Sequence, residues 1–166
     1  MKRMGAICLG VLVLCALSAG AREDATCRFI RESLSLFGQT KAEMIAFLGE
    51  PEQITTEKMA SMWYEGRVDV ITSLQYPGLY LETLYLYQGE NSIEYPLTVD
   101  VTGESIEMPL GLGIGATRDR VRAVMGEPAA ISDEDGSWLY GCDMEEVSFH
   151  FSGDRVDRIV CRGYFP

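Results

Sequence analysis

The sequence predicts an α+β fold of two tandem repeats, each a short helical segment packed on one face of a three- to four-stranded antiparallel sheet. Three observations lead to this prediction. A pattern of residues at 38–51 occurs again, without a gap, at 115–128. Each copy carries residues that begin and end a short helix. Each copy is followed by runs that alternate like β-strands, so each unit has the same order of elements.

The repeated pattern is G-x-T-x-x-x-[VM]-x-x-[FV]-[LM]-G-x-P, and its two copies are 77 residues apart, from Gly38 to Gly115. Thr40 and Thr117 stand where a hydroxyl can accept a hydrogen bond from a free helical N–H. Gly49 fits the left-handed position after a helix, and the proline two residues later prevents continuation.

Each predicted helix has one apolar face by the i, i+3, i+4 rule. The residues on these faces are Met44, Phe47 and Leu48 in the first copy and Val121, Val124 and Met125 in the second. A helix of about two turns is unstable alone, so its apolar face should lie on a sheet.

The strands are predicted from alternation and turn residues. In the second unit they are 137–141, 146–151 and 155–161, with a tight turn at Ser152-Gly153-Asp154. In the first unit they are 62–64, 67–76 and 79–87. One extra strand is expected near Leu97–Val101.

The predicted domain organisation has four parts: a signal peptide at 1–21, a first repeat at 22–88, a linker at 89–103 and a second repeat at 104–166. Lys2 and Arg3 give a positive start, and 7–17 is an apolar run too short for a comfortable membrane span. Small residues at 19–21 predict cleavage before Arg22. A buried N-terminal helix is the alternative. The chain is therefore expected to be exported, to the periplasm or the exterior, without a membrane span after cleavage.

The chain is acidic, with 14 Lys and Arg against 25 Asp and Glu and a net charge of -11. Removal of 1–21 takes away Lys2 and Arg3 and leaves -13. This charge argues against nucleic acid or anionic lipid as the main partner and points to a protein with a basic surface. The single histidine excludes His-rich metal sites, and no cofactor is expected.

Three cysteines remain in the mature chain, at 27, 142 and 161. Cys142 and Cys161 are expected to be the pair, because they lie in the same unit, although connectivity cannot be read from sequence. Packing of free thiols is the alternative. A cysteine nucleophile with His150 as its base is a further alternative.

The strands carry more aromatic side chains than two small cores need. Alternation places Val147, Phe149 and Phe151 under the helix and Ser148 with His150 on the opposite face. Tyrosine and tryptophan are enriched at binding hot spots. We therefore predict a partner-binding surface made of Tyr64, Tyr85, Tyr87, Trp138, Tyr140 and His150. The alternative is that these residues pack across strands and between the units.

The helix pattern, followed by a strand with Trp or Tyr, a hairpin and a last strand, resembles the SmpA/OmlA family. That family includes a small lipoprotein subunit of the outer-membrane β-barrel assembly machine. Two such units in tandem are similar to the β-lactamase inhibitory protein family. The resemblance implies adjoining sheets whose concave face binds another protein, with an acidic loop residue entering the enzyme's active site. Glu65 and Asp69 lie in the corresponding hairpin.

The leading hypothesis is an exported, non-enzymatic protein-binding module, with inhibition of a secreted or periplasmic hydrolase such as a β-lactamase as its narrower form. An envelope structural or outer-membrane assembly accessory protein is the first alternative. The second is a Ca²⁺ site at Asp133-Glu134-Asp135 or a Cys-dependent enzyme. The sequence has no nucleophile elbow, P-loop or Gly-rich dinucleotide turn.

Overall fold

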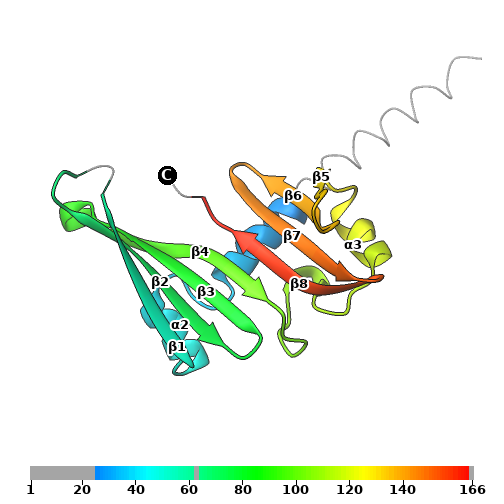
Figure 1. Cartoon of the computed structure of the whole chain (residues 1–166), viewed down its shortest axis with the longest axis horizontal. Coiled ribbons are helices and arrows are strands. Elements are labelled where there is room, and N and C mark those ends of the chain that lie inside the picture. Colours follow the sequence, from blue (N-terminus) through cyan, green and yellow to red (C-terminus); the bar gives the residue numbers. More distant parts are fainter. Residues whose placement is uncertain (1–24, 62–63, 165–166) are drawn as a thin grey trace, which may run out of the picture.

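The computed structural model describes residues 25–61 and 64–164 (Figure 1). The expected signal peptide and its cleavage site lie outside these residues. Residues 25–35 are helical, followed by α2 (Lys41–Leu48) and α3 (Arg118–Met125), with short 3₁₀ turns η1 (Gly89–Asn91) and η2 (Pro109–Gly111). In the described part of the chain, no helix combines the length and apolar character needed to cross a membrane.

All eight strands belong to one antiparallel sheet, in the order β1-β2-β3-β4-β8-β7-β6-β5. They are β1 (Gln53–Ala60), β2 (Val68–Tyr76), β3 (Leu79–Leu86), β4 (Ile93–Val101), β5 (Ala130–Ile131), β6 (Trp138–Cys142), β7 (Glu145–Ser152) and β8 (Arg155–Arg162). The predicted combination of helices with antiparallel strands is confirmed. Strands β4 and β8 join the two halves, with register from Thr98 opposite Arg162 to Val101 opposite Ile159.

The helices lie on one face of the sheet, behind it in Figure 1. Helix 25–35 crosses behind the junction of β4 and β8, and its Phe29 and Ile30 are completely buried. Met44 of α2 and Val121 of α3 are buried in the same apolar cluster. One hydrophobic core therefore runs under both halves of the sheet.

The predicted helix ends are confirmed. The Thr40 hydroxyl accepts from the Glu43 N–H at 3.2 Å, and the Glu43 carboxylate accepts from the Thr40 N–H, which forms a capping box. The Thr117 hydroxyl accepts from the Arg120 N–H at 3.2 Å. The glycine after each helix has a positive φ, 84° in the first and 86° in the second.

The apolar face expected for α2 is only partly buried. Met44 packs into the core, but the Phe47 side chain is 69% exposed and its ring lies 6.4 Å from that of Phe37. The rotation of α2 on the sheet therefore differs from the expected one.

One strand prediction for the first half is wrong, and another is confirmed with wider bounds. The strand expected at 62–64 is not the first strand; β1 occupies Gln53–Ala60, Tyr64 lies in the turn that follows it, and residues 62 and 63 are outside the described part. The extra strand near Leu97–Val101 is present as β4, which is longer and central to the sheet. The segment expected to be a linker thus contributes one of the two strands that join the halves.

The expected Cys142–Cys161 pair is wrong. Cys142 is bonded to Cys27 of helix 25–35, and Cys161 is free and buried. The reason is the strand order: Cys142 is on β6 and Cys161 on β8, with β7 between them. Two strand spacings of ~4.8 Å separate the backbones too far for a disulfide.

Candidate functional site: the open face of the sheet

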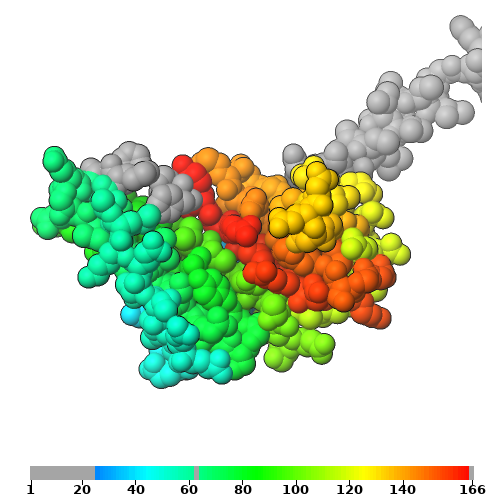
Figure 2. Space-filling view, viewed as in Figure 1, coloured from blue at the N-terminus to red at the C-terminus, as the bar shows by residue number. Residues whose placement is uncertain are grey.

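The sheet face opposite the helices, here named the open face, faces the viewer in Figures 1 and 2. Strand register and alternation define which side chains it carries. From β1 to β6 they include Gln53, Thr55, Ile71, Ser73, Gln75, Tyr80, Glu82, Leu84, Tyr95, Thr98, Asp100, Arg158, Val160, Arg162, Glu146, Ser148, His150 and Leu139. Most of these side chains are polar, and the apolar Leu84 and Val160 among them are buried.

Tyr80 is the centre of a hydrogen-bonded group in the first half of this face. Its hydroxyl donates to the Glu82 carboxylate and lies 3.0 Å from the Ser73 hydroxyl. Burial, followed by the hydrogen bond with Glu82, raises the pKa of Tyr80. These contacts lay the Tyr80 side chain along the sheet, between hollows of about 490 and 190 Å³ that both include Gln75.

Arg158 connects the two halves of the open face. Its guanidinium is bidentate to the Asp100 carboxylate, with Nε–Oδ1 of 2.9 Å and Nη2–Oδ2 of 2.6 Å. Arg162 donates to Glu146 at 2.7 Å. Bidentate pairing fixes both side chains, so the open face is geometrically defined across the junction of β4 and β8.

His150 lies in a chain of three polar residues in the second half. Its Nδ1 donates to Asp135 Oδ2 at 2.8 Å, and its Nε2 lies 3.1 Å from the Ser148 hydroxyl. The backbone N–H of Ser137, its hydroxyl, the Ser132 hydroxyl and His150 hold the pKa of Asp135 well below its usual range. These hydrogen-bonded side chains hold the loop before β6 against β7.

The order Ser148–His150–Asp135 is also that of a nucleophile, a base and an orienting acid. Ser148 is 3% exposed and is paired with Leu139 on one side and Val160 on the other. The backbone N–H groups beside it lie between paired strands in the sheet ladders, so they are not free to bind an oxyanion. The contacts therefore support a structural role for these three side chains.

Trp138 and Tyr140 do not lie on the open face. They are 4% and 3% exposed and belong to the core under α3. The register explains this correction, because Tyr140 is opposite Val147 and directly opposed residues point to the same face. The Tyr140 hydroxyl donates to the Gly126 carbonyl at 3.1 Å, and burial raises its pKa to about 12.

The three tyrosines expected in the first half occupy another region. Tyr64 and Tyr87 stack edge to face with ring centroids 5.8 Å apart, and the Arg67 guanidinium lies 4.8 Å from the Tyr87 ring. Tyr85 is opposite Val70, on the helix side of β3. The six predicted residues therefore do not form one surface, and only His150 belongs to the open face as a strand residue.

The acidic residues singled out in the sequence have different surroundings. Asp69 is 2% exposed and accepts from the Tyr87 N–H at 2.8 Å, so it is not a residue that can enter a partner's site, whereas Glu65 is exposed. Asp133 to Asp135 form a turn. Within residues 25–61 and 64–164, no group of three or more His, Cys, Asp or Glu is placed to hold a metal ion.

Sequence reasoning missed Tyr80, Asp100 and Arg158, and it considered Asp135 only as a Ca²⁺ ligand and not as the partner of His150. The available signal was alternation in β3, because Leu79 and Leu81 are apolar and Tyr80 and Glu82 must then face the other way. The partner of Arg158 depends on the pairing of β4 with β8, which no local pattern gives.

Comparison of the chain with protein-family models, curated proteins and solved structures gave no match.

Proposed function

We propose that the chain is an exported, non-enzymatic protein-binding module whose partner contacts the open face. The observation that carries this proposal is the uneven coverage of the sheet: the helices cover one face, and no helix of the described residues covers the opposite one. Antiparallel sheets can face water on one side. Here, however, paired and hydrogen-bonded side chains already fix that face, which lowers the ordering cost of association.

The charge supports a basic partner. The protein has a net charge of -11. Long-range attraction between this charge and a basic surface raises the association rate at low salt. The partner is a protein rather than a nucleic acid because phosphate recognition requires basic patches, whereas Arg158 and Arg162 are both occupied by carboxylates.

We further propose that two tandem copies of one unit form this surface. Three details support the duplication. Each copy has a threonine N-cap and a positive-φ glycine after its helix. The strand order runs 1-2-3-4 and then 8-7-6-5. The Tyr76 hydroxyl donates to the Gly49 carbonyl at 3.0 Å, as the Tyr140 hydroxyl does to that of Gly126. The counterpart of Tyr140 in this contact is Tyr76.

Site-specific photocrosslinking in the native host tests the open face. A photoreactive phenylalanine at Gln75 or Leu139 places the probe on that face, whereas the same probe at exposed Phe47 on α2 is the matched control. We expect the same crosslinked protein from Gln75 and Leu139 and not from Phe47. Crosslinks from Phe47 alone would contradict the proposed face.

The narrower form, inhibition of a hydrolase, is tested with the mature chain in a rate assay against secreted β-lactamases. Inhibition that weakens with salt and is lost on Gln75→Arg would support it.

Export is tested by mass spectrometry of the protein recovered from the periplasm and medium, with an N-terminus at Arg22 as the expected result. Recovery only in the membrane fraction, with a retained N-terminus, would favour an envelope structural role.

A further inference from the structure

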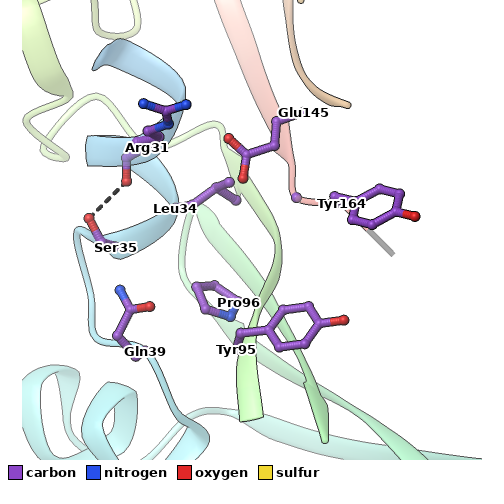
Figure 3. A pocket seen from close by; sticks show the side chains of 9 residues that line it. Arg31, Leu34, Ser35, Gln39, Tyr95, Pro96, Glu145 and Tyr164 are labelled. Atoms are coloured by element: carbon purple, nitrogen blue, oxygen red, sulfur yellow. Dashed lines mark hydrogen bonds between the residues drawn. The ribbon is translucent and has the colours of Figure 1, made fainter. Parts of the chain in front are cut away.

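A recess lies at the place where β4 and β8 separate, on the side of helix 25–35 (Figure 3). Gly163, just after β8, donates from its N–H to the Leu97 carbonyl at 2.7 Å. A Cβ at Gly163 would stand 2.9 Å from the Pro96 carbonyl, so the backbones of the two segments are in contact there. After this contact, Tyr164 turns away from β4. The volume of this recess, here named the seam pocket, is about 360 Å³, within the ~300–1,000 Å³ of small-ligand sites.

One part of the seam pocket is apolar. Leu34 of helix 25–35 and Pro96 of β4 are both buried and line the recess from neighbouring elements. In Figure 3 the two side chains lie one above the other at its centre. They offer contact for an aliphatic stem but no hydrogen bond.

The charge of the seam pocket is negative. Arg31 lines the recess but donates to Asp143 at 3.1 Å, so that pair is neutral. Glu145 lines it as well, and within the described residues its carboxylate has no ion-pair partner. The carboxylate of Glu145 lies between Leu34 and Tyr164 in Figure 3.

Two aromatic rings complete the lining. Tyr95 and Tyr164 line the recess, and in Figure 3 their rings point to the side away from Leu34 and Pro96. Burial, with the charge of Asp69 and the neighbouring Tyr164, raises the pKa of Tyr95 to about 12, so its ring carries no charge near neutral pH. Its hydroxyl is buried and has no hydrogen-bond partner in the part of the chain that the structure describes.

We propose that the seam pocket receives a lysine side chain of the protein partner, with its methylene groups on Leu34 and Pro96 and its ammonium group at Glu145. A lysine has an aliphatic stem and a compact charge with three donors, which matches an apolar floor that ends at a carboxylate. The inference rests on the proposed function, because it names a chemical group on the partner. Leu34, Pro96 and Glu145 lie on the helix side of the sheet, opposite the open face.

Nuclear magnetic resonance of the ¹⁵N-labelled mature chain tests the proposal with two blocked pentapeptides, Gly-Gly-Lys-Gly-Gly and the same peptide with norleucine in place of lysine. We expect the lysine peptide alone to shift the amide signals of Gly163, Tyr164 and Glu145. Glu145→Gln should weaken this binding about tenfold, as loss of a charged hydrogen-bond partner does. Tyr164→Ala, at an exposed position after the sheet, should weaken it as well.

Glu146→Gln is the matched control, because Glu146 is the next residue on β7 but pairs with Arg162 on the opposite face. It should leave the lysine peptide's affinity unchanged. An equal response to the norleucine peptide, or unchanged affinity in Glu145→Gln with a native-like spectrum, would overturn the seam-pocket proposal. The proposed function fails separately, when the Gln75 and Leu139 probes give no crosslinked protein.

Discussion

Cys27 in helix 25–35 is bonded to Cys142 at the end of β6, 115 positions further along the sequence. The bond therefore fastens the first described helix, which crosses behind the junction of β4 and β8, to the second half of the sheet. Arg31, one helical turn further on, pairs with Asp143 beside the bond. Both contacts hold the same helix against the same hairpin.

Removal of this disulfide should strongly destabilise the protein. For the double substitution Cys27→Ser and Cys142→Ser we expect a loss of about 2–5 kcal/mol in the free energy of unfolding, because the unfolded chain loses a long closed loop. Urea denaturation of the variant and of wild type, each with and without reductant, measures it. A wild-type midpoint that does not respond to reductant would contradict the prediction.

The hydroxyls of Tyr76 and Tyr140 should contribute equally to stability. Each donates to the carbonyl of the glycine that ends a helix, at 3.0 and 3.1 Å. Tyr76→Phe and Tyr140→Phe should each cost about 1 kcal/mol, and the double variant about the sum. Tyr85→Phe, at an exposed position, is the control and should cost less. A loss of stability in only one of the two single variants would contradict the prediction that the two contacts are equivalent.

Local patterns in the sequence were sufficient for α2, α3 and the three longer strands of the second half, whereas helix 25–35 and β5 were not predicted. The threonine and glycine positions predict both ends of α2 and α3 because capping depends on neighbouring residues. Alternation in 146–151 predicts β7, since Val147 and Phe149 are apolar and face the core.

The remaining features depend on contacts that are distant in the chain. Strand β1 is almost entirely exposed, so it carries no apolar alternation. The face of Tyr140 follows from its register opposite Val147, and one residue of slip would reverse it. The Cys27–Cys142 disulfide could not be predicted without knowing that helix 25–35 reaches β6. The candidate site was missed for the same reason, because Arg158 meets Asp100 only through the pairing of β8 with β4.

The Cys161 thiol should be unreactive in the folded protein. Its side chain is buried, and burial raises its pKa to about 12, so the reactive thiolate is scarce at pH 8. We expect iodoacetamide to modify Cys161 only after denaturant is added, as counted by mass spectrometry under non-reducing conditions. Rapid modification of one thiol in native protein, at a rate close to that in urea, would contradict the buried position.

The contribution of Asp135 to stability should disappear in acid. The Ser137 N–H, the Ser137 and Ser132 hydroxyls and His150 lower the pKa of Asp135 in the folded state, whereas the unfolded value is 3.8. A group whose pKa falls on folding stabilises the protein above its unfolded pKa, and this stabilisation is lost as the pH falls toward the folded value. Wild type should therefore be more stable than Asp135→Asn at pH 7, and the difference in urea midpoint should shrink below about pH 4. Asp133→Asn, in the same exposed turn, is the matched control and should give a smaller difference at pH 7. A difference for Asp135→Asn that stays constant from pH 7 to pH 2.5 would contradict the assigned hydrogen bonds.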